Sequence, residues 1–157
     1  MIHVVEVSYL TGVKDPSGQS VKKEILELGL PVKEVSSIQV YELTGALSSR
    51  DLEKIGRELL TDHVTQAFSR DRTAPPRGAW AVEVWFKPGV TDVVGESVRH
   101  SILDLGFDAI KKARTGTKYL IRGPLAPAQV ARVSRELLSN ALIHQTKIFP
   151  SRAGSHS

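Results

Sequence analysis

The sequence predicts an α+β protein made of two tandem β-α-β-α-β units with antiparallel sheets, paired as an internal pseudo-twofold dimer. Three observations lead to this fold class. The chain repeats itself once along nearly its whole length, and each copy alternates strand-like and helix-like apolar patterns. A single copy of about seventy residues also buries little of its surface alone, so the two copies should pair.

The repeat becomes visible when the sequence is shifted by 77 residues, and by 78 residues after Ala109. Matched segments include Val5-Glu6-Val7 with Val82-Glu83-Val84, and Arg57-Glu58-Leu59-Leu60 with Arg135-Glu136-Leu137-Leu138. Identities that keep register over some seventy residues indicate a duplicated unit. The predicted boundaries are 1–69 for the first unit, 70–78 for a linker rich in proline and charge, 79–149 for the second unit, and 150–157 for a flexible tail.

Each unit opens with an apolar, β-branched strand, at 3–10 and at 79–86. Trp80 and Trp85 are five residues apart, so they should face opposite sides of the second of these strands. A helix follows in each unit, because apolar residues recur there at i, i+4 and i+7: Val21, Ile25 and Leu28, matched by Val98, Ile102 and Leu105.

The ends of these first helices carry recognisable signals. Asp15 and Asp92 are the predicted N-caps, and Pro16 suits the first helical position, where a missing N–H costs nothing. Gly29 and Gly106 stand where a helix ends with a left-handed residue.

The second half of each unit continues with a strand, expected at 38–43 and 118–123. Ser48 and Pro127 should open the next helix, whose apolar stripe is Leu52, Ile55 and Leu59 in one copy and Val130, Val133 and Leu137 in the other. Asp62 and Asn140 fall just past the end of that helix, and both residue types tolerate left-handed backbone. Short apolar segments close the units at 64–68 and 142–149, and the second of them is a credible strand.

Composition excludes several classes of protein. The chain has no cysteine, so it forms no disulfide and has no thiolate metal site, which fits a reducing cytosol. No apolar run approaches the roughly 20 residues that span a bilayer. The net charge is +4, but the lysines and arginines are dispersed among acidic residues and do not form a basic run. This pattern favours a solvated surface over a nucleic-acid binding site.

The two Gly-Val-x-Asp-x-x-Gly loops could bind an anion at a helix N-terminus. They match neither a phosphate loop nor a dinucleotide fingerprint, and their aspartate would repel a phosphate. We therefore interpret the glycines as a turn and a close helix–strand contact, with the aspartate as a cap. The five histidines show no metal-ligand spacing, and no residue is predicted to be catalytic or to bind a cofactor.

Taken in order, these motifs resemble the PurS family, the small subunit of formylglycinamide ribonucleotide amidotransferase (phosphoribosylformylglycinamidine synthase). The second copy carries the resemblance through Lys87-Pro88-Gly89-Val90, Asp92, Gly95, Leu105-Gly106-Phe107, Gly116-Thr117-Lys118-Tyr119, Leu137-Leu138-Ser139-Asn140 and Leu142-Ile143. The first copy carries Gly12-Val13, Asp15-Pro16-Ser17-Gly18 and Leu28-Gly29. Four positions depart from the family pattern: Leu10-Thr11 replaces Lys-Pro, and Val93 and Ala141 each replace a proline.

The resemblance implies an auxiliary role in purine synthesis. PurS subunits bridge a glutaminase (PurQ) and a synthetase (PurL) and support the transfer of ammonia between them; the complex uses ATP, magnesium and glutamine, none of which this chain is expected to bind itself. The resemblance also implies that the chain could self-associate. It implies no nucleic-acid or membrane partner and a location in the cytoplasm. The candidate structural or interface residues are Gly12, Asp15, Gly18, Lys87, Pro88, Gly89, Asp92, Gly95, Lys118, Tyr119 and Asn140.

Several alternatives stay open from the sequence. The chain could be a free-standing tandem PurS or the first part of a PurS–PurL fusion. A tandem regulatory module similar to ACT domains would also place aspartate and glycine in the first strand–helix loop. The polar residues Gln19 and Glu96 after those glycines speak against this alternative.

Overall fold

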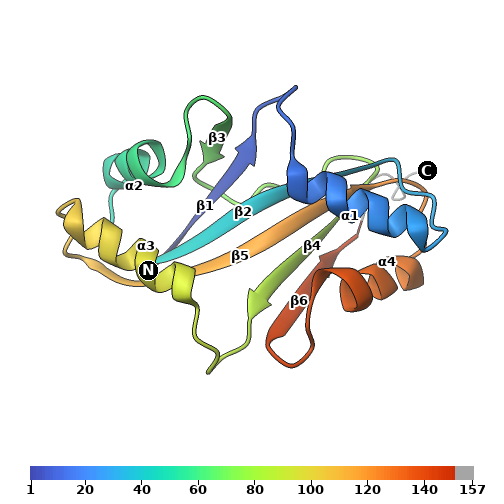
Figure 1. Cartoon of the computed structure of the whole chain (residues 1–157). Coiled ribbons are helices and arrows are strands. Elements are labelled where there is room, and N and C mark those ends of the chain that lie inside the picture. The colour runs from blue at the N-terminus through green and yellow to red at the C-terminus, as the bar shows by residue number, and fades with distance from the viewer. Residues whose placement is uncertain (151–157) are drawn as a thin grey trace. The chain divides into compact units, whose positions relative to one another are not determined.

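The computed structural model of the chain describes residues 1–150, and Figure 1 shows how its elements follow one another. Each repeat forms a strand, a helix, a longer strand, a second helix that ends in a π-helical turn, and a last strand. The predicted β-α-β-α-β order and α+β class are confirmed. The first repeat comprises β1 (Ile2–Tyr9), α1 (Pro16–Glu27), β2 (Glu34–Gly45), α2 (Ser49–Ile55), η1 (Gly56–Leu60) and β3 (Gln66–Ser69). The second comprises β4 (Ala79–Phe86), α3 (Val93–Asp104), β5 (Ile110–Arg122), α4 (Pro127–Val133), η2 (Ser134–Leu138) and β6 (His144–Phe149).

The strands are ordered β3-β1-β2-β5-β4-β6 in a six-stranded sheet. The last strand of each repeat lies antiparallel beside the first strand of the same repeat. In this register Glu6 faces Ser69, and Glu83 faces Lys147. Antiparallel pairing is therefore confirmed, and the two repeats build equivalent edges.

The second strands are longer than predicted. They cover Glu34–Gly45 and Ile110–Arg122, whereas the apolar pattern predicted only 38–43 and 118–123. Polar residues in the first half of each strand, such as Ser37 and Thr115, hid the alternation. These side chains are satisfied by hydrogen bonds to an aspartate rather than by water.

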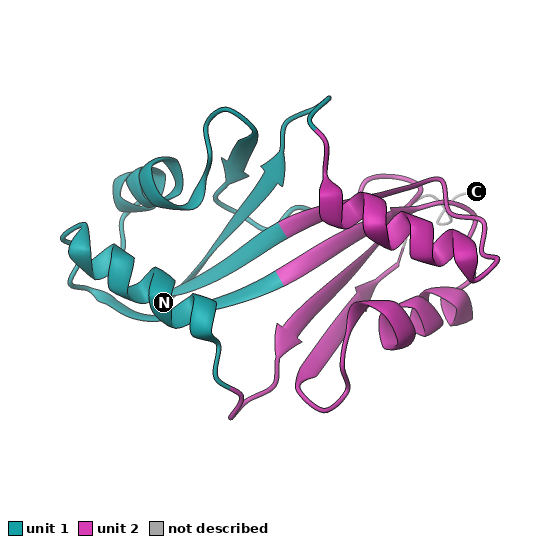
Figure 2. Ribbon diagram, viewed as in Figure 1, with its two compact units in different colours: residues 1–13, 39–73, 91–116 teal, residues 14–38, 74–90, 117–157 magenta. Residues whose placement is uncertain are grey.

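Two compact units make up the fold, and they do not follow the repeats (Figure 2). Unit 1 consists of residues 1–13, 39–73 and 91–116, and unit 2 of residues 14–38, 74–90 and the described residues from 117 onward. Each unit thus takes its first strand, second helix and last strand from one repeat, and its first helix from the other. The repeats pair by exchanging this helix together with the strand segment that follows it.

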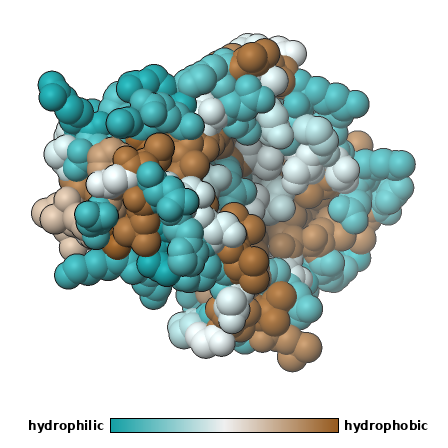
Figure 3. All heavy atoms as spheres, turned by 60° about the vertical axis from the view of Figure 1, so that its left-hand side comes forward, coloured by the Kyte–Doolittle hydropathy of each residue, from teal (hydrophilic) through white to brown (hydrophobic). Residues whose placement is uncertain are grey.

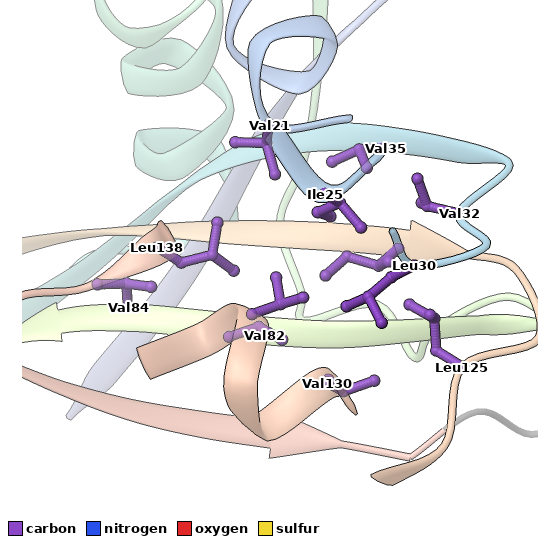
Figure 4. Close-up of a cluster of buried hydrophobic side chains, with 12 residues drawn as sticks. Val21, Ile25, Leu30, Val32, Val35, Val82, Val84, Leu125, Val130 and Leu138 are labelled. Atoms are coloured by element: carbon purple, nitrogen blue, oxygen red, sulfur yellow. The ribbon is translucent and has the colours of Figure 1, made fainter. Parts of the chain in front are cut away.

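The core of unit 2 shows the exchange directly (Figure 4). Val21 and Ile25 of α1, from the first repeat, pack with Val82 of β4 and Val130 of α4, from the second. Ile25, Val82 and Val130 are completely buried. Burying a side chain of this size stabilises a fold by about 1.5–3 kcal/mol, so α1 makes a substantial contribution to a core that its own repeat does not otherwise form.

Unit 1 repeats the arrangement with the roles reversed. Ile102 of α3, from the second repeat, is completely buried among Val5 and Val7 of β1 and Leu52 and Ile55 of α2, all from the first repeat. The predicted apolar stripes of both first helices therefore face cores, and each core belongs to both repeats.

The predicted helix signals are largely confirmed. Asp15 and Asp92 are N-caps, and Gly29 and Gly106 have left-handed backbone, with φ of +82° and +101°. Asp62 and Asn140, which tolerate left-handed backbone, do not adopt it, because no non-glycine residue among 1–150 has a positive φ. The second helices end instead in the π-helical turns, after which the chain becomes extended at once, at Thr61 and Ser139. Ser48 caps α2 through a reciprocal bond with Asp51, whereas Pro127 starts α4.

The segment 70–78, predicted to be an exposed linker, is tied to unit 1 at its start. The Thr73 hydroxyl donates to Glu6 Oε1 at 2.7 Å, and Arg72 Nη2 lies 2.7 Å from Glu42 Oε2. These bonds hold the beginning of the segment against β1 and β2. Apart from Pro150, the predicted tail lies outside the described residues.

Candidate functional site

The aspartate of each Gly-Val-x-Asp-x-x-Gly loop joins a helix to a strand. Asp92 accepts the Gly95 backbone N–H at 2.8 Å, the Thr115 N–H at 2.7 Å and the Thr115 hydroxyl at 2.9 Å. Asp15 repeats this with Gly18 and Ser37, at 2.9 Å to the Gly18 N–H and 2.6 Å to the Ser37 N–H. The carboxylate therefore fills the N-terminus of the helix, where an external anion would otherwise bind.

Gly18 and Gly95 allow the helix to approach the strand closely. A Cβ at Gly18 would lie 2.5 Å from the Val35 carbonyl oxygen, and one at Gly95 would lie 2.5 Å from the Ala113 carbonyl oxygen. Backbone atoms cannot move away as a flexible side chain can. We call each such set of residues an aspartate clamp. One clamp is Asp15 with Gly18 and Ser37, and the other is Asp92 with Gly95 and Thr115.

The clamps explain how a helix can be exchanged between repeats as one piece. Each clamp joins a first helix to the strand segment that follows it, and both partners belong to the same compact unit. Residues 14–38 and 91–116 are the exchanged segments. The motif that looks like a ligand loop therefore holds together the segment that each repeat donates.

The glycines that precede the clamps form turns at the ends of the first strands. Gly12 and Gly89 have φ of +86° and +88°, a conformation that side chains rarely adopt. Lys87 and Pro88 are exposed, and the Lys87 backbone N–H donates to the Ile143 carbonyl at 2.8 Å. Of the candidate residues, the structure thus brings Lys87, Pro88 and Gly89 beside the loop that begins at Asn140.

Asn140 organises that loop. Its Oδ1 accepts the Leu142 N–H at 2.9 Å, and its carbonyl accepts the N–H groups of Ile143 and His144. Asp62 does the same in the first repeat, accepting the Val64 N–H at 3.0 Å. These two loops, 62–65 and 140–143, place Val64 and Leu142 at their tips, 82% and 84% exposed. They are called the tip loops below.

The two ends that carry tip loops differ chemically. In unit 1 the Leu10 N–H donates to the Thr65 carbonyl at 2.8 Å, so exposed Leu10 stands where unit 2 has Lys87. Exposed apolar residues occur elsewhere too, and the face shown in Figure 3 carries hydrophobic patches separated by hydrophilic surface. Scattered apolar exposure is usual on proteins. The two ends that carry tip loops differ from such scattered exposure because they share one backbone geometry. They present different residues on that geometry.

Lys118 is buried and Tyr119 is partly buried. Tyr119 packs against the core of unit 2, and Lys118 is only 2% exposed. Because neighbouring residues of a strand face opposite sides, Lys118 points away from the helix-covered face. A direct contact of Lys118 with a partner would need the fold to open, so its candidate role is structural.

Sequence reasoning missed the buried carboxylates of the first strands. Glu6 and Glu83 are 3% and 2% exposed, and Glu83 Oε1 accepts the Trp85 indole N–H at 3.0 Å. Trp80, on the opposite face, donates to the Leu125 carbonyl, which confirms that the two tryptophans diverge. The repeated Val-Glu-Val gave no signal of this, because alternation of apolar and charged residues is typical of a strand with one solvated face.

A second missed feature is an ion-pair cluster in unit 1. Glu42, 14% exposed at its side chain, lies 2.7 Å from both Arg72 Nη2 and Arg114 Nη1. The equivalent of Glu42 in the second repeat is Leu120, and that of Arg114 is Ser36. The second repeat therefore lacks the residues that would form the same ion-pair cluster on the sheet face opposite the helices.

The described residues offer little reactive chemistry. Residues 1–150 contain no group of three or more histidine, aspartate or glutamate side chains that could hold a metal ion. Burial raises the pKa of the Tyr41 phenol, but this side chain packs against the core of unit 1. Within the same residues, no helix has the length and apolar character needed to cross a bilayer.

Comparison with known proteins gives a family match over both repeats. The model of the family described as PurS, phosphoribosylformylglycinamidine (FGAM) synthase, matches residues 3–73 and again residues 79–150. No curated protein matches the chain significantly. Among solved structures, the chain is similar to PurS of Methanocaldococcus jannaschii, one of the subunits of formylglycinamide ribonucleotide amidotransferase in the purine biosynthetic pathway. The two are 24% identical over 45% of this chain and 92% of that one, with a TM-score of 0.42.

The two family segments together take in nearly all of the described chain, and they coincide with the two copies seen in the sequence. This match favours PurS over the ACT-like alternative. The chain belongs to the PurS family of phosphoribosylformylglycinamidine synthase, and it carries two PurS units in tandem.

Proposed function

We propose that the chain is the PurS-type component of FGAM synthase and joins the glutaminase (PurQ) to the synthetase (PurL) during ammonia transfer. The observation that supports this most is the double match to the PurS family, which accounts for both halves of one chain. In this proposal the chain does no chemistry itself. ATP, magnesium and glutamine are bound by the other components, and the complex works in the cytoplasm.

The physical need for such a component follows from the chemistry of ammonia. Ammonia released in water becomes ammonium, which is not nucleophilic, so it must pass between the two active sites through a closed, dry passage. A protein with a rigid core and exposed ends can hold two enzymes in register without contributing a reactive group. Here each compact unit has a buried core, and an aspartate clamp joins its exchanged helix to the strand that follows.

The two ends with tip loops are the surfaces that we propose for docking. Their backbone geometry is the same, but one presents Leu10 and Val64 and the other presents Lys87 and Leu142. A pair of identical subunits would present the same residues at both ends. Fusion into one chain has allowed the ends to diverge, so we propose that they contact different proteins.

Co-purification tests this proposal. The full chain would be mixed with the PurL and PurQ proteins of the same host, in the presence of ATP, magnesium and glutamine, and separated by size-exclusion chromatography. We expect all three proteins to elute together. Matched variants, Leu10→Glu at one end and Lys87→Glu at the other, should each weaken the binding of a different protein. Elution of the chain apart from both proteins would contradict the proposed function.

A further inference from the structure

The tip loop of unit 2 is fastened by a histidine. The Asn140 backbone N–H donates to His144 Nδ1 at 2.9 Å, and this bond joins the start of the loop to the first residue of β6. Unit 1 fastens its tip loop at the same place, but there the Asp62 N–H donates to the Gln66 side-chain oxygen at 3.0 Å. The repeats therefore differ in the chemistry of one acceptor within otherwise equivalent loops.

A backbone N–H can only donate, so the His144 bond fixes the state of the ring. Nδ1 must carry a lone pair, which means that the imidazole is neutral and that its proton is on Nε2. A protonated imidazole has N–H groups at both positions, and one of them would face the Asn140 N–H. The glutamine amide of unit 1 keeps its acceptor oxygen at every physiological pH.

We propose that His144 is a proton-sensitive latch on the tip loop of unit 2. While the imidazole is neutral the latch is closed, and a proton on Nδ1 opens it. The loop that it fastens carries Leu142 and adjoins Lys87. The tip loop of unit 1 has no such dependence. The inference concerns this chain alone and does not rest on the proposed function.

On the described strands β4 and β6, the face that carries His144 has no acidic side chain. β6 is paired with β4, and the β4 residues on the same face as His144 are Phe86, Val84 and Val82. The Phe86 ring lies 5.2 Å from the imidazole between centroids, at 39°. The nearest charged residues along the two strands are the cation Lys87, beyond Phe86, and Lys147, which faces Glu83 on the other side of the sheet.

Amide exchange measured by NMR provides the test, with unit 1 as an internal control. The protection factor of the Asn140 N–H, corrected for intrinsic exchange, is followed from about pH 8 to about pH 5. Loss of one hydrogen bond should lower it by about fivefold, while the protection factor of the Asp62 N–H stays constant. Nitrogen-15 shifts of the His144 ring should also show the Nε2–H tautomer at the higher pH.

Two variants exchange the acceptors between the repeats. His144→Gln should keep the Asn140 N–H protected at both pH values, and Gln66→His should transfer the pH dependence to the Asp62 N–H. Constant protection of Asn140 across the pH range in the wild-type chain would overturn the proposal. So would an Nδ1–H tautomer at the higher pH, or an equal loss of protection in the His144→Gln variant.

Discussion

At the scale of single residues, one carboxylate in each repeat satisfies donors from two elements. Asp92 accepts the N–H of Gly95 in the helix and both donors of Thr115 in the strand, at 2.7–2.9 Å. Neither donor set can turn to another partner without separating the helix from the strand. The clamp therefore joins local structure, the N-cap, to tertiary structure, the exchanged segment.

Removing this carboxylate should be costly. Asp92→Ala is expected to lower the free energy of unfolding by about 2–3 kcal/mol, because the variant loses an N-cap and leaves the Thr115 N–H without its acceptor. Asp15→Ala should have a similar effect through the Ser37 N–H. Urea denaturation followed by circular dichroism measures both. The exposed Asp104→Ala at the other end of α3 is the control, and an equal loss there would contradict this role.

Tyr41 makes stability depend on high pH. Burial raises the pKa of its phenol in the folded chain, so the unfolded chain releases this proton first as the pH increases. The contribution is fully present below the ordinary value of about 10 and is lost as the pH rises through the folded-state pKa. Tyr41→Phe should reduce the fall in unfolding free energy above that pH. Parallel denaturation curves at neutral and high pH decide this, and an unchanged fall in the variant would contradict it.

At the scale of secondary structure, the π-helical turns show how the repeats have diverged while keeping their fold. Both second helices end in a five-residue π-helical segment, which begins at Gly56 in one copy and at Ser134 in the other. A Cβ at Gly56 would lie 2.5 Å from the ring of Phe68. The residue of the second repeat that corresponds to Phe68 is Thr146, which is smaller. Glycine on the turn thus accompanies phenylalanine on the last strand, and serine on the turn accompanies the smaller threonine.

A double-mutant cycle tests this compensation. Gly56→Ser alone should destabilise the chain by about 1–3 kcal/mol, since the added atoms overlap the Phe68 ring. Phe68→Thr alone should also destabilise, because it leaves a cavity in the core of unit 1. The double variant recreates the pair found in the second repeat and should cost less than the sum. Strict additivity of the two losses would show that the residues do not compensate for each other.

The sequence predicted the elements well where one residue type carries a definite signal. The caps Asp15 and Asp92 and the left-handed glycines Gly29 and Gly106 are where their local chemistry requires them. The second strands were predicted too short, because a side-chain bond such as that of Thr115 to Asp92 can hide a polar residue in a strand. Such a bond joins residues 23 positions apart, and periodicity cannot reveal it.

At the scale of the whole molecule, duplication predicted that two units pair, but not how. The apolar stripe of α1 predicts that Ile25 is buried. It does not predict which repeat supplies the residues that pack against Ile25. Either partner would satisfy the same hydrophobic pattern. The buried Glu83 and Lys118 were unpredictable for a related reason, since the satisfaction of a buried charge depends on tertiary neighbours. Of the candidate residues, the structure gathers Lys87, Pro88, Gly89 and Asn140 at one end.

Sharing both cores between the repeats has a consequence for function. Each unit depends on a helix from the other repeat, so the two units are inseparable parts of one chain. Their ends can still diverge, as Leu10 and Lys87 have done, and the ion-pair cluster of Glu42 shows the same divergence on the sheet. A fused pair can in this way offer two different docking surfaces.

Reconstituted FGAM synthase provides the most direct test of this role. Formation of the amidine product is measured for the PurL and PurQ proteins of the host, with and without this chain, first with glutamine and then with ammonium salts as nitrogen source. We predict that omitting the chain largely abolishes the glutamine-dependent rate and leaves the ammonia-dependent rate of the synthetase in place. An unchanged glutamine-dependent rate without the chain would contradict the proposal that it joins the two enzymes.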